Sequence, residues 1–236
     1  RIVNWTAGAY LAFDNLDGKL AKGSGYEEQR WAGGLYGRWQ HQNLWLNGQV
    51  YYANLDVDSH RRVQLGAAER IHHGSADGDQ YGGKISAGMN WQQGKITHGP
   101  VLSLSAQKAT VKSLREQGKL STAMSFDEQE HTSIQSGLGY QAQWVVNDAW
   151  QVYGSAQWQH EFKDVDDVVG ARLNSVDDMH FVLPVNTGDA KNSGVLELGV
   201  NGNISEHWQV GAGVLAEVGD APNAQTSVFV NTSYRF

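Results

Sequence analysis

Residues Tyr81 to Trp91 read YGGKISAGMNW, and this alternation indicates how the chain is built. Every second residue from Tyr81 is apolar, aromatic or small, and the series passes through Ile85 to end at Trp91. The residues between them are small or polar, and they include Lys84. Because successive side chains of a strand point to opposite faces, this period of two predicts a β-strand with one apolar and one polar face.

Similar periodicity, with more exceptions in some places, recurs along the chain. The predicted strands cover residues 5–13, 31–39, 44–52, 81–91, 102–106, 134–146, 152–162, 196–204, 208–218 and 226–236. Tilted strands that cross a membrane have about ten residues, whereas strands of soluble proteins average about half that length. The sequence therefore favours about ten strands of membrane-spanning length.

The segments between these strands alternate between short and long. Short polar turns lie at residues 4–5, 43–45, 94–97, 147–150 and 205–208. Long polar connections are predicted at residues 15–29, 55–79, 108–130 and 163–193, with a shorter one at 219–224. This alternation predicts consecutive antiparallel hairpins, with tight turns at one end of the sheet and long loops at the other.

The composition excludes several classes of protein. The 236 residues include 28 Gly, 3 Pro and no Cys, with a mean hydropathy of −0.48 and a formal net charge of −7. No segment approaches the roughly 20 apolar residues of a membrane-spanning helix. The absence of Cys excludes a disulfide scaffold, and the negative charge argues against a nucleic-acid partner, which would need a basic face.

Aromatic residues gather near the ends of the predicted strands. They are Trp5, Tyr52, Trp91, Trp144, Trp150, Phe162, Trp208 and Phe236. An apolar outer face, aromatic girdles and a polar inner face are typical of transmembrane barrels. A soluble sandwich would need a second apolar layer, which the sequence lacks. We therefore predict an all-β, antiparallel, up-and-down transmembrane β-barrel of about ten strands, closed because lipid offers no hydrogen bonds.

The polar face carries spaced charged residues that are predicted to line the lumen. These are Arg38, Lys84, Glu161, Glu197 and Glu217. We interpret them as a charge network of the lumen rather than as catalytic residues.

Several segments resemble the translocator domains of autotransporters (type V secretion), most closely those with GDSL-type esterase or lipase passengers. The first are KSLRE at 112–116, STAMSFDEQE at 121–130 and GLGY at 137–140. A second similarity joins Ala171–Leu173 and Phe181–Leu183 to the Gly-rich strand Leu196–Val200. The resemblance covers essentially the whole chain, at low identity outside these segments.

The resemblance implies a function that is not enzymatic and needs no cofactor or metal. Such a domain anchors the chain in the bacterial outer membrane, with long loops extracellular and tight turns periplasmic, and supports passage of the passenger to the surface. The implied partners are outer-membrane lipid and lipopolysaccharide, the barrel assembly machinery, the passenger and a linker helix. No Gly-Asp-Ser-Leu block occurs, so an esterase nucleophile would lie outside this chain.

The family barrel has twelve strands and a helix in its lumen. Aligned from the C-terminus, residues 1–236 supply only the last ten, so we expect this domain to lack its first two strands and the preceding helix. The alternative is a relative of the family that closes with ten strands, an even number that a single-chain barrel permits. The final strand ends Tyr234-Arg235-Phe236, which resembles the terminal aromatic signal that the assembly machinery reads. The chain departs from that signal at Asn231, where Gly is usual, and at Phe229, where a polar residue is usual.

Alternative functions remain open at this point. A small porin would have the same strand pattern. An omptin-like ten-stranded protease would use acidic residues and a histidine at the rim, and the connection at 163–193 contains Asp166, Asp167, Asp177, Asp178 and His180. The connection at 55–79 contains His72, His73, Asp77 and Asp79, which are zinc-type ligands, but their spacing matches no defined site. We expect neither a catalytic nor a metal site.

Overall fold

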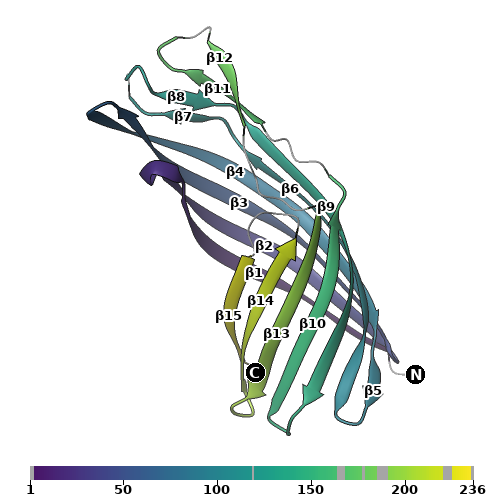
Figure 1. Ribbon diagram of the computed structural model, residues 1–236. Coiled ribbons are helices and arrows are strands. Elements are labelled where there is room, and N and C mark those ends of the chain that lie inside the picture. The colour runs from purple at the N-terminus through teal and green to yellow at the C-terminus, as the bar shows by residue number, and fades with distance from the viewer. Residues whose placement is uncertain are drawn as a thin grey trace.

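The computed structural model describes residues 3–118, 120–163, 168–176, 179–184, 191–219 and 225–234 (Figure 1). Within them the chain forms fifteen strands and one 3-10 turn, η1 at Ala21–Gly23. The strands are β1 Val3–Lys19, β2 Gly25–His41, β3 Leu44–Leu65, β4 Ala68–Met89, β5 Trp91–Gln93, β6 Ile96–Val111, β7 Leu114–Glu116, β8 Met124–Phe126, β9 Gln129–Val145, β10 Trp150–Glu161, β11 Val168–Leu173, β12 His180–Pro184, β13 Asn192–Asn203, β14 Trp208–Gly219 and β15 Gln225–Tyr234. None of the described helical segments is long and apolar enough to cross a membrane.

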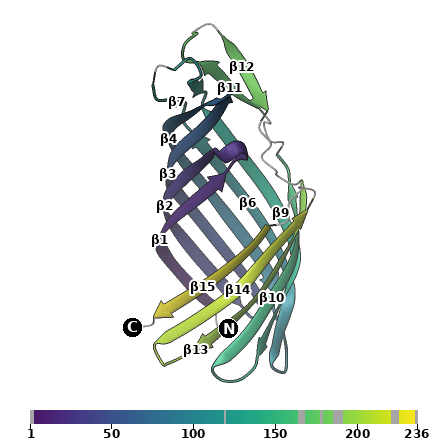
Figure 2. The ribbon, with the colours of Figure 1, turned by 60° about the vertical axis from the view of Figure 1, so that its left-hand side comes forward.

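Ten of these strands form one continuous antiparallel meander. Their order is β1-β2-β3-β4-β6-β9-β10-β13-β14-β15, with the short β5 pairing only β6. The sheet curls so that its edge strands, β1 and β15, come to the same side of the molecule (Figure 2). Between the described residues of these two strands there is no hydrogen-bonded ladder. The antiparallel all-β architecture predicted from the sequence is confirmed.

The convex face of the meander is apolar and exposed. Leu11 is 88% exposed and Val230 is 79% exposed, and many other large apolar side chains share this face. The buried apolar side chains of the described residues are few by comparison. Large contiguous apolar surface marks an interaction with lipid or protein, so the apolar part of this face requires a partner.

Glycines of the concave face lie under aromatic rings of the neighbouring strands. A Cβ atom placed on Gly8 would lie 2.5 Å from the hydroxyl oxygen of Tyr36, and one on Gly34 would lie 2.5 Å from the Tyr10 ring. In each pair the glycine and the tyrosine are directly opposite in the ladder. Glycine is therefore required at these two positions because an aromatic ring occupies the space above each.

The predicted long connections are partly wrong, because regular strands continue into them. β1 and β2 extend through most of residues 15–29, and β3 and β4 fill residues 55–79 except for the turn at Gly66. Backbone pairing continues there although the side chains become polar, and our prediction ended each strand where its apolar face ended. Consequently His72, His73, Asp77 and Asp79 lie on strand β4 rather than in a loop.

The connections at 108–130 and 163–193 also contain short strands. β7 pairs β4, β8 pairs β7, and β11 joins β8 to β12. These strands lie beside the far end of β4, at the top of Figure 1, and extend the same sheet from the β4 edge. We call β7, β8, β11, β12 and the residues that join them to β3–β4 the cap.

Candidate functional site: the concave face and the cap

A ladder of polar side chains crosses five strands on the concave face. Arg30 on β2 makes an ion pair with Asp14 on β1 at 2.6 Å and donates to Gln80 on β4 at 3.2 Å. Gln107 on β6 accepts hydrogen bonds from Tyr51 on β3 at 3.0 Å and from Gln80 at 3.4 Å. Sequence reasoning missed Arg30, although it has the same parity as Gly34 and Arg38 on β2 and is therefore expected on the polar face.

A polar cavity of about 300 Å³ lies nearer the tight turns and brings two of the predicted charged residues together. Arg38 from β2 and Glu197 from β13 both line it. The rest of its wall is mainly amide and hydroxyl side chains, among them Asn47, Gln141 and Tyr153. A surface rich in such groups is suited to contact with water or with a polar chain.

The other three predicted charged residues do not join this cavity. Lys84 lies opposite Gln49 and Ser105, and Glu217 lies opposite Val195 and Gln225. Glu161 is buried at the far end of β10, where it accepts hydrogen bonds. The donors are the Ser133 hydroxyl at 2.5 Å and the backbone N–H groups of Ile134 and Lys163 at 2.8 Å each.

Trp45 turns inward near the tight turns. It is only 6% exposed, and its ring covers Gly88 on the neighbouring strand. Its indole N–H donates to the Asn90 side-chain oxygen at 3.2 Å, and Gln141 donates to the same oxygen at 3.2 Å. The large ring narrows the concave face at this end.

The cap contains a buried charged cluster. Glu116 is 3% exposed, and its carboxylate accepts two hydrogen bonds from Arg61, at 2.6 and 2.7 Å, and one from the Met124 backbone N–H at 2.7 Å. His72 is 1% exposed, lies 3.9 Å from the Glu116 carboxylate, and its Nε2 is 2.9 Å from the Thr122 hydroxyl. Arg61 and His72 are opposite each other on the concave side of β3–β4, so the segment around Thr122 lies on that side.

The described residues of the cap contain no metal-binding cluster. Among the described residues, no three His, Cys, Asp or Glu side chains are placed to hold a metal ion. His180 lies on β12 opposite Arg172. The four aspartates of the protease alternative, Asp166, Asp167, Asp177 and Asp178, lie outside the described residues.

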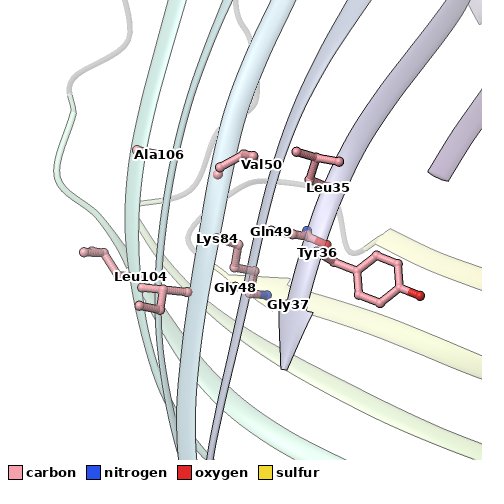
Figure 3. A pocket seen from close by; sticks show the side chains of 11 residues that line it. Leu35, Tyr36, Gly37, Gly48, Gln49, Val50, Lys84, Leu104 and Ala106 are labelled. Carbon is pink, nitrogen blue, oxygen red and sulfur yellow. The ribbon is translucent and has the colours of Figure 1, made fainter. Parts of the chain in front are cut away.

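The convex face has a shallow depression that contrasts with the polar cavity. Leu35, Val50 and Leu104 border it, and Gly37 and Gly48 leave it open (Figure 3). Its volume is about 520 Å³. Such an apolar surface is compatible with lipid tails rather than with water.

The model of the autotransporter β-domain family matches residues 2–214. The chain belongs to this family. It is therefore an outer-membrane translocator domain, and the family match does not support the porin or protease alternatives. The convex face is the lipid-facing side, and the concave face is the lumen side.

Known relatives are similar over most of this chain. Lipase 1 of Photorhabdus luminescens is 28% identical over 84% of the chain, and Esterase EstA of Pseudomonas aeruginosa is 24% identical over 76%. This chain spans only 31% and 28% of the lengths of those two proteins.

Solved structures support the fold. The translocator domain of NalP from Neisseria meningitidis has a TM-score of 0.71 at 15% identity, with 99% of this chain and 75% of that chain covered. The transport unit of AIDA-I from Escherichia coli has a TM-score of 0.58 at 18% identity, with 100% and 77% covered.

The predicted assembly-signal residues are placed only in part. Tyr234 ends β15 on the convex face, where its ring contacts Trp208 at 5.1 Å between centroids. Phe236 lies outside the described residues.

Proposed function

We propose that this translocator domain anchors a GDSL-type esterase or lipase passenger and supports its passage through a polar lumen to the cell surface. The lumen-side ladder from Asp14 to Gln107 carries the proposal, because it keeps a hydrated surface inside a sheet whose other face is apolar. The names of the relatives, Lipase 1 and Esterase EstA, support the passenger class. The domain itself contributes no bond chemistry in this proposal.

Two further strands and a linker helix complete the domain in this proposal. β1 and β15 each present an edge without a ladder between their described residues, and an open edge is costly in lipid. Two added strands would satisfy both edges. The linker helix would then pass the five predicted lumen charges, Arg38, Lys84, Glu161, Glu197 and Glu217, with long hairpins extracellular and tight turns periplasmic.

We propose that the barrel assembly machinery recognises Tyr234 and Phe236. Deleting Phe236 from the full-length protein should reduce outer-membrane insertion and passenger display together, as measured by membrane fractionation and antibody labelling of intact cells. Deleting a turn residue such as Gly66 is the matched control and should leave insertion unchanged. Normal membrane insertion without Phe236 would contradict its role as an assembly signal. Normal insertion with loss of passenger display would show that the residue acts in passage of the passenger rather than in barrel assembly.

Reversing a charge in the lumen tests passage of the passenger separately from insertion of the barrel. Glu197→Arg places a second cation in the cavity that Arg38 lines. We expect normal insertion and reduced passenger display, and display equal to wild type would contradict a role for these charges.

A further inference from the structure

Imidazoles lie beside aromatic rings at the tight-turn end of the lipid-facing surface. The ring centroids in each pair are 5.7 to 6.1 Å apart. The pairs are His41–Trp39, His98–Trp91, His98–Tyr140 and His207–Tyr234. Three different hairpins of the meander contribute them. Sequence reasoning identified the aromatic girdle but assigned no role to these histidines.

The strand register places these rings outward. His41 and Trp39 have the same parity on β2 as the exposed Leu35, and His98 is opposite Trp91 on β5. Tyr234 is exposed on the convex face beside His207. The imidazoles therefore lie at the level of the girdle, where aromatic side chains meet lipid headgroups.

An imidazole in this position has a chemistry that Trp and Tyr lack. When protonated it is a cation that donates two hydrogen bonds, and a neighbouring aromatic face stabilises the charge. Anionic lipid headgroups attract such cations.

The side chains that neighbour each imidazole determine how well it can bind a lipid phosphate. His41 lies opposite Leu44 on β3 in the ladder, and this neighbour is apolar. His98 faces the Tyr140 hydroxyl, 2.6 Å from its Nδ1. His207 lines a cavity with the carboxylates of Asp148 and Glu206, which compete with a lipid phosphate.

We propose that His41 and His98, with a smaller part for His207, form a headgroup-binding belt for anionic phospholipids. The ligand atoms are the phosphate oxygens of the leaflet at the tight-turn end, and binding strengthens when the imidazoles are protonated. The proposal requires only that the convex face contacts lipid, and it is independent of the passenger.

The test compares vesicles of phosphatidylcholine alone with vesicles that also contain phosphatidylglycerol. The full-length protein is folded into each, and its urea midpoint is followed by tryptophan emission at about pH 5.5 and pH 8, on either side of the ordinary imidazole pKa of about 6.5. We expect acid to raise the midpoint in anionic vesicles by more than in neutral ones. The His41→Gln/His98→Gln variant should lose most of this difference.

A matched control removes two imidazoles outside the girdle. His60 and His73 are opposite each other on the exposed side of β3–β4, well beyond the tyrosine pair at 52 and 81. His60→Gln/His73→Gln should therefore keep the wild-type difference.

Replacing the two imidazoles with permanent cations gives a second test of the same vesicle preference. His41→Arg/His98→Arg should favour anionic vesicles at both pH values, and it keeps the test valid should the Gln variant fail to fold. The proposal is overturned by a wild-type pH effect that is equal in both vesicles, by a Gln variant that keeps the difference, or by an Arg variant that is indifferent to lipid charge.

Discussion

The two ends of the sheet differ in structure. At the tight-turn end the strands of the meander end together, Trp45 fills the lumen side, and imidazoles lie among the outer aromatic rings. Toward the other end β3 and β4 extend beyond β1 and β2, with carboxylates on their outer side, and β7 of the cap pairs the edge of β4. One end thus holds all the strands of the meander, whereas at the other the sheet continues through the short strands of the cap.

Acidic residues lie opposite each other on the outer side of the extended β3–β4 hairpin, and stability alone does not explain this arrangement. Asp56 and Asp77 are directly opposite each other, and Glu27 is opposite Asp58. Like charges in such positions destabilise a sheet. The contacts that compensate lie on the inner side, in the cluster around Glu116. We therefore expect the tight-turn end to unfold with the whole barrel and the cap to open on its own.

The largest effect is expected from Trp45→Ala at the tight-turn end. Removing a buried Trp side chain costs about 3–5 kcal/mol, and the loss should appear in the global unfolding free energy, measured by urea titration in detergent micelles. Trp45→Phe keeps a ring over Gly88 and loses the hydrogen bond to Asn90, so it should cost only about 1 kcal/mol. Equal stability of the Ala variant and the wild type would contradict a structural role for this ring.

Glu116→Gln tests the opposite end. Removing one partner of a fully buried ion pair costs about 3–5 kcal/mol. Because Arg61 is 30% exposed, the loss here should be smaller, and it should be local. Hydrogen exchange should increase in residues 112–126 and stay unchanged in β9 and β10. The control is Glu130→Gln, which removes an exposed partner of Lys108 and should change neither region. Faster exchange throughout the barrel would show that the two ends are coupled.

The sequence predicted the meander because lipid imposes a period of two on every spanning strand. The same rule misled us at residues 55–79, where the environment is polar on one side and pairing depends on the backbone alone. Arg61 and Glu116 are 55 residues apart, and no local pattern joins them. Glu116 was noticed only within the segment that resembles the family, and its buried contact with Arg61 appears only in the fold.

A smaller effect is expected from glycines midway between the two ends. Gly34→Ala would press on the Tyr10 ring, and such overpacking costs about 1–3 kcal/mol. Gly48→Ala is the matched change on the lipid side, where a Cβ atom meets nothing within 4 Å; it should be neutral or slightly stabilising. Both are measured by the same urea titration. Equal effects of the two substitutions would contradict the difference between the crowded lumen side and the open lipid side.

Arg30→Gln should have the smallest effect, although it removes an ion pair of 2.6 Å. The Arg30 and Asp14 side chains are 36% and 50% exposed, so the pair contributes about 0–1 kcal/mol and should weaken as salt increases. Urea titrations at low and high salt measure this. The contrast with Glu116 is one of solvent: the Glu116 side chain is 2% exposed, whereas both partners of the lumen pair are exposed. A loss as large as that of Glu116→Gln, independent of salt, would mean that water is excluded from this level of the lumen and that the ladder is a structural element of the barrel.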